Sequence, residues 1–426
     1  MDWFRCWRGK HDIVRRRASA VEGYRTPRRF AAAGRQTSSR GSGNLGGGEC
    51  ARRLQSREGG STLWKMDALI LHELHQTLGA RFGTLAGEPV VTDYGNEAEE
   101  FAALRQTAGV LDLSFRGRIC LTGADRSRFL HGQVTNDIKK LRIGEGCYAA
   151  LVTTKGKMES DLTVFNLADE ILLDFEPGMT EIVTQRLEKH IVADDVQIVD
   201  AVPHYGLVSV QGPKSREAVA ALGLFESLPG AAFHIVKGED ATLGELYLAN
   251  HPRLGTSGFD LFIPNNSLGA VADKLIAAVR QMGGQPCGWT AFETARIEAG
   301  IPRFGADMNS NYLPLECNLE SAVVYNKGCY IGQEIINRVH TFGHVNKELR
   351  GLVLRDMAGN RAAPGDKLFQ QGAEAGLLTS VVYSPTLKAD IALGFVRREC
   401  NQIGTELTVK NAAGEIGARV VKLPFG

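Results

Sequence analysis

The feature that most constrains the fold is a change in the pattern of apolar residues near residue 345. Between residues 118 and 282, short apolar runs typical of strands alternate with segments whose apolar residues recur at helical spacing. After residue 345 only short β-like runs follow, separated by turns that contain glycine or proline. The sequence therefore predicts an α+β region followed by a small C-terminal β-barrel.

The α+β region reads as two successive units in which strands and helices follow the same order. Strands are predicted at 118–122, 147–152, 161–165 and 171–175 with helices at 126–132 and 179–190, then strands at 207–210, 246–249 and 259–263 with helices at 213–222 and 266–282. Units of this kind are typical of ferredoxin-like modules, although no sequence repeat relates the two. Further helices are expected at 66–82 and 290–298.

Charge divides the chain at about residue 65. Residues 1–65 carry 15 Lys/Arg against 5 Asp/Glu, so the formal net charge of +1 hides a mildly acidic remainder. An acidic body gives no support to direct nucleic-acid binding. We therefore predict three parts, a basic leader at 1–65, an α+β region at 66–345 and a β-barrel at 346–426.

The leader has no sustained hydrophobic period and is expected to be disordered. It has three readings: a transit peptide, a basic tail that touches nucleic acid, or upstream DNA translated from an early start codon. We favour the third reading, because Met66 directly precedes the first segment with helical spacing.

Cysteine spacing and hydropathy indicate the cellular compartment in which the protein is expected. The eight cysteines are scattered and form no Cys-x-x-Cys pair, which fits a reducing cytoplasm better than a disulfide framework. No run of about 18 apolar residues exists, so we expect no membrane span.

The segment with the densest chemistry is Lys327–Glu334, Lys-Gly-Cys-Tyr-Ile-Gly-Gln-Glu. Its two glycines allow a turn or a close approach to a ligand. A lysine two positions before Cys329 can make that thiol nucleophilic. The alternative is a polar loop in which Cys329 only fills space.

Lys327–Glu334 resembles the signature of YgfZ-type folate-binding proteins, in the superfamily of the glycine-cleavage aminomethyltransferase. Other segments resemble superfamily motifs: Leu111–Ser114, Phe129–Asp137, Ala295–Pro302 and Leu313–Glu316. The resemblance extends from about residue 109 to the C-terminus. It implies two α+β modules and a barrel around a central folate channel.

The resemblance also implies a set of tetrahydrofolate-binding residues. Asp161 occupies the strand where aminomethyltransferases carry two aspartates, but Ser160 replaces the first, which puts acid–base chemistry in doubt. Glu298 matches the glutamate that binds the pterin ring. The other expected folate ligands are Lys327, Tyr330, Gln333 and Arg338, with Arg338 at the glutamate tail.

Each of these assignments has a structural alternative. Asp161 can cap a turn, Glu298 can pair with a neighbouring base, and Arg296 can pair with Glu293 three residues away. His340 and His344 would share a metal only on one helix, and Gly343 between them disfavours that, so no metal site is expected.

Cys329 is the expected catalytic residue, and tetrahydrofolate the expected cofactor. The first functional reading implied by the resemblance is a folate-binding protein that assists iron–sulfur cluster assembly or repair, and thereby tRNA modification, with iron–sulfur proteins as partners. The alternative is an aminomethyltransferase of the glycine cleavage system. A third reading is a scaffold in which folate is structural.

Overall fold

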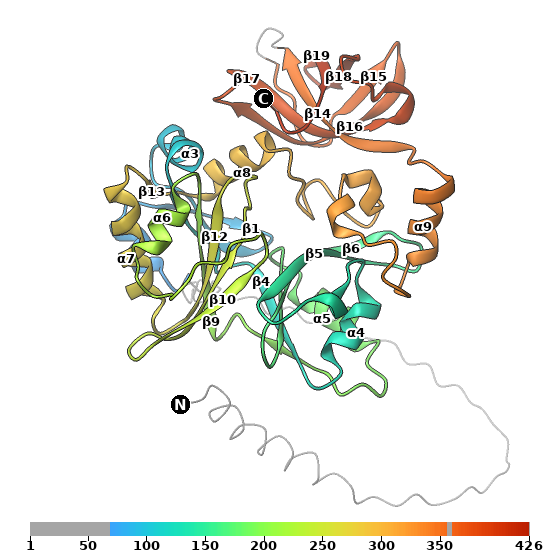
Figure 1. Cartoon of the computed structure of the whole chain (residues 1–426). Coiled ribbons are helices and arrows are strands. Elements are labelled where there is room, and N and C mark those ends of the chain that lie inside the picture. Colours follow the sequence, from blue (N-terminus) through green and yellow to red (C-terminus); the bar gives the residue numbers. More distant parts are fainter. Residues whose placement is uncertain (1–68, 356–359, 426) are drawn as a thin grey trace, which may run out of the picture. The chain divides into compact units, whose positions relative to one another are not determined.

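The computed structural model describes residues 69–355 and 360–425. The predicted leader at 1–65 lies outside these residues. The described chain is a mixed α+β structure that ends in a closed six-stranded barrel, which confirms the predicted fold class (Figure 1).

The first module is a five-stranded antiparallel sheet with two helices on one face. Its strand order is β5 (Glu145–Val152), β6 (Met158–Asn166), β7 (Ile171–Phe175), β4 (Gly117–Thr122), β8 (Gln197–Asp200). The apolar sides of α4 (Arg126–Gln133) and α5 (Thr180–Glu188) pack on this sheet through a buried cluster that includes Leu130, Leu162 and Leu187. The opposite face of the sheet is thereby free to meet the rest of the chain.

The second module repeats this plan around a six-stranded sheet. Its strand order is β10 (Ile235–Asp240), β11 (Gly244–Asn250), β12 (Gly258–Pro264), β9 (Tyr205–Gln211), β3 (Gly109–Asp112), β13 (Gln285–Pro286). Helices α6 (Ser215–Ala220) and α7 (Leu268–Gln281) cover one face. Strand β3 precedes the first module in sequence, yet it pairs with β9 and β13 of the second.

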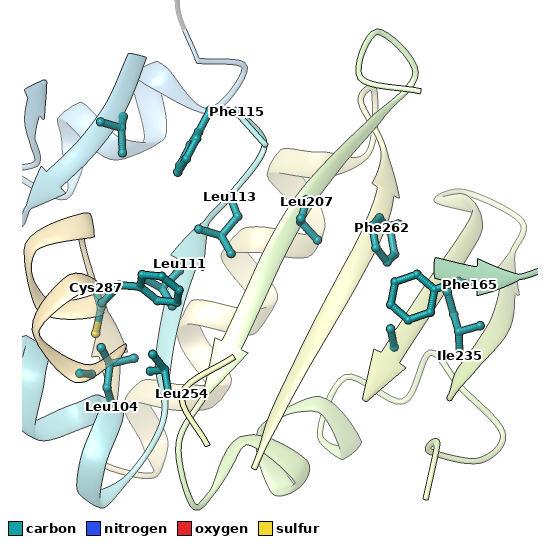
Figure 2. Packing of buried hydrophobic residues seen from close by; sticks show 14 of the residues in the cluster. Leu104, Leu111, Leu113, Phe115, Phe165, Leu207, Ile235, Leu254, Phe262 and Cys287 are labelled. Atoms are coloured by element: carbon teal, nitrogen blue, oxygen red, sulfur yellow. The ribbon is translucent and has the colours of Figure 1, made fainter. Parts of the chain in front are cut away.

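A buried apolar cluster joins the faces of the two sheets that α4–α7 leave uncovered. In Figure 2, Phe165 of β6 lies beside Phe262 of β12, and their ring centroids are 5.9 Å apart. Helices α3 (Glu97–Gln106) and α8 (Trp289–Glu298) contribute Leu104 and Phe292 to the same cluster. The modules therefore share one core.

The remaining elements frame these modules. They are α2 (His72–Thr77), β1 (Arg81–Leu85), β2 (Glu88–Asp93), the short 3-10 helices Ile138–Lys140, Pro314–Cys317, Glu320–Ala322 and Arg398–Cys400, and α9 (Gln333–Phe342). The helix expected at 66–82 is shorter in the structure, because Gly79 adopts a positive φ of 79° and β1 follows.

The barrel strands follow the order β14 (Lys347–Arg355), β17 (Ala389–Arg397), β16 (Ala373–Ser384), β15 (Lys367–Gln370), β18 (Glu406–Asn411), β19 (Gly414–Val421), and β19 closes on β14. An interior cluster of Leu, Val, Ile and Ala fills it. Among the residues that the structure describes, no helix combines the length and apolarity that a membrane crossing requires.

Candidate functional site

Side-chain alternation along β6 places Asp161 on the face away from α4 and α5. Leu162 and Val164 belong to the cluster under those helices, whereas Phe165 belongs to the cluster between the sheets. Ser160 lies on the helix-covered side and is fully buried. Of the Ser160–Asp161 pair, only Asp161 therefore faces the centre of the molecule.

The Asp161 carboxylate has one partner and one unused oxygen. The hydroxyl of Tyr148 donates to Oδ2 over 2.8 Å, while the buried Oδ1 accepts no hydrogen bond from residues 69–355 or 360–425. Burial, and then the negative charge of Glu176, raises the pKa of Asp161 to about 6 against the opposing influence of Tyr148 and Arg116. A half-buried carboxylate that titrates near neutrality is suited to proton transfer.

Next to Asp161 runs a chain of alternating charges, which we call the central ion chain. It links β12 of the second module to β7 of the first, then α8, and finally the segment after α8 that contacts β16 of the barrel. Its members are Asp260, Arg253, Asp174, Arg116, Glu176, Arg303, Glu293, Arg296 and Asp307.

Within the two modules, the charged residues of the central ion chain form short ion pairs. Arg253 is 2.7 Å from Asp260 and 2.8 Å from Asp174, and Arg116 is 3.0 Å from Asp174 and 2.7 Å from Glu176. Burial alone would raise the pKa of Asp174, but the charges of Arg116 and Arg253 outweigh it and hold the pKa at about 2. These pairs hold the two modules together.

The end of the central ion chain at the barrel is equally tightly paired. Arg296 pairs with Glu293, as the sequence spacing allowed, and its Nη1 lies 2.5 Å from Asp307. Asp307 also accepts hydrogen bonds from the hydroxyls of Thr379 and Ser380 on β16. The chain of charges thus reaches the barrel.

Arg303, in the middle, is loosely held. Its guanidinium lies 3.5 Å from Glu176 and 3.8 Å from Glu293, beyond hydrogen-bond length, and its central carbon lies over the Trp289 ring, 4.8 Å from the ring centre. Among the described residues, its buried Nε and Nη1 have no hydrogen-bond partner, nor does Oε2 of Glu293. Buried polar atoms are rarely left unpaired, so this cluster is the best candidate for a ligand site.

Glu298, the expected pterin ligand, contacts the barrel. Its carboxylate accepts hydrogen bonds from the hydroxyls of Ser384 and Thr386 and from the Thr386 amide, and Arg105 is 3.9 Å away. These three hydrogen bonds use most of the roughly four acceptor sites of a carboxylate. We assign it instead to the attachment of α8 to the barrel.

We therefore expect Glu298→Ala to lower the free energy of unfolding by about 1–3 kcal/mol, because it leaves the buried Ser384 hydroxyl without its acceptor. The dissociation constant for tetrahydrofolate should stay within twofold of the wild-type value. Urea unfolding and a tetrahydrofolate titration measure the two effects. A variant with normal stability and weak binding would restore Glu298 as a folate ligand.

The signature Lys327–Glu334 forms a buried attachment with an exposed tip. Lys327 Nζ donates to the carbonyls of His131 and Val134, each over 2.6 Å, and burial lowers the pKa of Lys327 to about 8. Gly328 and Gly332 have φ angles of 103° and 83°, which confirms the predicted turns. Lys327 thus ties the signature to the motif Phe129–Asp137.

The other signature residues differ in burial. Tyr330 is buried, and burial raises its pKa to about 12; Cys329 is exposed. Gln333 begins α9, and Arg338 is exposed further along that helix. Within residues 69–355 and 360–425, no hydrogen bond or ion pair joins the signature to Asp161. The ammonium of Lys327, committed to two carbonyls, points inward and not to the Cys329 thiol.

The sequence drew attention to Asp161 but not to Tyr148 and Glu176, which act on its carboxylate, nor to Arg303. A partial signal was available, since charged residues stand inside or beside strongly apolar strands, as Asp174 and Glu176 do at the end of β7. His340 and His344 do not share a helix, as Gly343 between them indicated, because α9 ends at Phe342.

Comparisons with known proteins cover almost all of the described chain. Residues 71–327 match the sequence model of the GCVT N-terminal domain, and residues 347–425 match that of the glycine cleavage T-protein C-terminal barrel domain. The aminomethyltransferase of Halalkalibacterium halodurans is 28% identical over 356 residues, 83% of this chain and 96% of that protein. That of Cupriavidus necator is 29% identical over 380 residues, 84% and 97% of the two chains.

A solved structure agrees with these matches. The glycine cleavage system aminomethyltransferase T from Bartonella henselae superposes with a TM-score of 0.76 at 25% identity, covering 85% of this chain and 98% of that one. These relatives contradict the first functional reading, assistance to iron–sulfur cluster assembly and tRNA modification, and give no support to iron–sulfur proteins as partners. That reading depended on eight signature residues, whereas the match to aminomethyltransferases spans most of the chain.

Proposed function

The chain belongs to the glycine cleavage T-protein family, and on this premise we propose that it is a tetrahydrofolate-dependent aminomethyltransferase. The proposed substrates are an aminomethyl group carried on the sulfur of a lipoyl protein and tetrahydrofolate. The products are methylene-tetrahydrofolate, ammonia and the free lipoyl thiol.

The observation that carries the proposal is the Asp161 carboxylate, aimed at the centre of the molecule with Oδ1 unused. Ser160, which stands in place of a second aspartate, is weaker evidence against acid–base chemistry than its sequence position indicated. Its side chain is buried on the opposite, helix-covered side of β6, where a carboxylate would not reach the charges around Asp161.

The geometry fits the proton transfers that the reaction requires. Two hydrogens leave the folate nitrogens as the methylene bridge forms; one ends on ammonia and the other on the lipoyl thiol. Asp161, with a pKa of about 6, can accept a proton from one nitrogen and return it to the leaving group. The Tyr148 hydroxyl fixes the carboxylate through Oδ2 and leaves Oδ1 for the substrate.

The cluster around Arg303 supplies complementary groups for folate. Within the part of the chain that the structure describes, Glu293 Oε2 is an unpaired acceptor and Arg303 offers unpaired donors. A 2-amino-4-oxo pterin ring presents N–H donors and a carbonyl acceptor, so the residues present fit it.

The test is an assay of ammonia release from an aminomethylated lipoyl carrier protein by the purified full chain. We expect ammonia and methylene-tetrahydrofolate in equal amounts, formed only when tetrahydrofolate is present. Reactions without the chain or without folate are the controls. Tetrahydrofolate binding without ammonia release above these controls would refute the transferase and leave a folate-binding protein.

A further inference from the structure

We propose that Arg303 is a specificity-determining residue that reads the 4-oxo group of the pterin ring, with Glu293 beside it reading the adjacent N–H groups. The inference rests on the proposed function for the identity of the ligand. It concerns which side chains of this chain distinguish a 4-oxo ring from a 4-amino ring.

Arg303 has N–H donors that its two carboxylate neighbours do not use. The side chain is 13% exposed, and two of its buried N–H groups have no acceptor. Its two carboxylate neighbours are closer to other arginines, since Glu176 is 2.7 Å from Arg116 and Glu293 pairs directly with Arg296. Neither carboxylate therefore depends on Arg303, and Arg303 has donors to offer.

Arg303 and Glu293 place an unused donor beside an unused acceptor. Arg303 Nε and Glu293 Oε2, both without hydrogen bonds, are 3.8 Å apart. The edge of a 2-amino-4-oxopyrimidine places a carbonyl next to N–H groups, the complement of this arrangement. Replacing the carbonyl by an amino group would set a donor against the guanidinium, which cannot accept a hydrogen bond.

Contact with Trp289 orients the Arg303 guanidinium. The Arg303 guanidinium lies over Trp289, and Trp289 stacks on Phe292 of α8 with ring centroids 5.0 Å apart. A guanidinium held against an aromatic ring loses freedom of movement while its N–H groups stay available for hydrogen bonds. The site is therefore arranged to present donors in a fixed direction.

The experiment compares the binding of tetrahydrofolate with that of its 4-amino analogue in three proteins: wild type, Arg303→Met and Arg186→Met. Arg186 is the matched control because its side chain is 10% exposed and pairs with Glu159 over 2.6 Å, but on α5. We expect the wild type to prefer tetrahydrofolate by roughly tenfold or more, the size expected when a charged donor loses its acceptor.

Arg303→Met should weaken tetrahydrofolate binding by a similar factor and reduce the preference to within about twofold. Its melting temperature should change little, whereas Arg186→Met should melt earlier and keep the preference. A purely structural Arg303 would give the reverse, a lower melting temperature with the preference intact, and would overturn the inference.

The two hypotheses fail differently. A wild type that binds no tetrahydrofolate refutes the proposed function, and the assignment of Arg303 with it. A wild type that binds tetrahydrofolate, paired with an Arg303→Met variant of equal preference, refutes only the assignment.

Discussion

Replacing Asp161 by asparagine should reduce turnover in the ammonia-release assay by about 10²–10⁴-fold, the usual contribution of a general acid–base residue. Asparagine has almost the same shape and still accepts the Tyr148 hydrogen bond, but it cannot carry a proton. The dissociation constant for tetrahydrofolate should change much less than turnover. Steady-state kinetics and direct titration separate the two effects.

The same substitution should leave the fold at least as stable. Burial raises the pKa of Asp161 to about 6, above the ordinary value of 3.8 expected in the unfolded chain. Ionisation therefore favours the unfolded chain as pH rises from about 4 to 6, and the wild type loses stability in that window. We expect Asp161→Asn to match the wild type at pH 4 and to exceed it at pH 7 by about 1–3 kcal/mol.

A pH profile and a control variant test the role of Asp161 further. Wild-type turnover should rise as pH increases through about 6, where the carboxylate becomes able to accept a proton, and the variant's residual turnover should lack that step. Asp169→Asn, on the exposed turn between β6 and β7, is the matched control and should keep full activity. Normal turnover in Asp161→Asn would show that the reacting proton goes elsewhere.

The largest loss of stability is expected for Asp174→Ala. Asp174 is fully buried between Arg116 and Arg253, so its removal leaves two buried guanidinium groups short of a counter-charge. Breaking one member of a buried ion network typically costs about 3–5 kcal/mol. Urea unfolding at pH 7 measures the difference in free energy of unfolding.

The pH dependence of Asp174 has the opposite sign to that of Asp161. Its pKa of about 2 in the folded chain lies below the ordinary 3.8, so its stabilising contribution is complete above about pH 4 and lost as pH falls towards 2. The gap between wild type and variant should narrow over that range. Glu415→Ala, which breaks an exposed pair with Lys410, should cost less than about 1 kcal/mol. Equal effects at both positions would mean that burial of the pair does not matter.

Local pattern was sufficient for much of the fold. Alternation along 161–165 placed Asp161 and Phe165 on one face, and the apolar spacing of 179–190 predicted α5 within two residues at each end. These signals lie within one element, where a period of 2 or 3.6 reports directly which side is buried. The loss of helical pattern after 345 predicted the barrel in the same way.

The site was harder because its residues are far apart in sequence. Glu298 was expected to bind a ligand, yet its partners Ser384 and Thr386 are about 86–88 positions away on the barrel. Lys327 stands two positions from Cys329, but its ammonium turns to carbonyls 193 and 196 positions away. Spacing along the chain reports which residues are close in sequence, not which buried groups must be satisfied.

Strand β3 makes the first module an insertion within the second. Gly109–Asp112 is synthesised before residues 117–200, yet its partners β9 and β13 come only at 205–211 and 285–286. On a ribosome, the first module can close as one continuous segment, while β3 waits for partners that emerge later. We expect the second sheet to be the late-forming part of the fold, and a fragment that starts after residue 112 to lack a central strand, leaving β9 with an open edge prone to association.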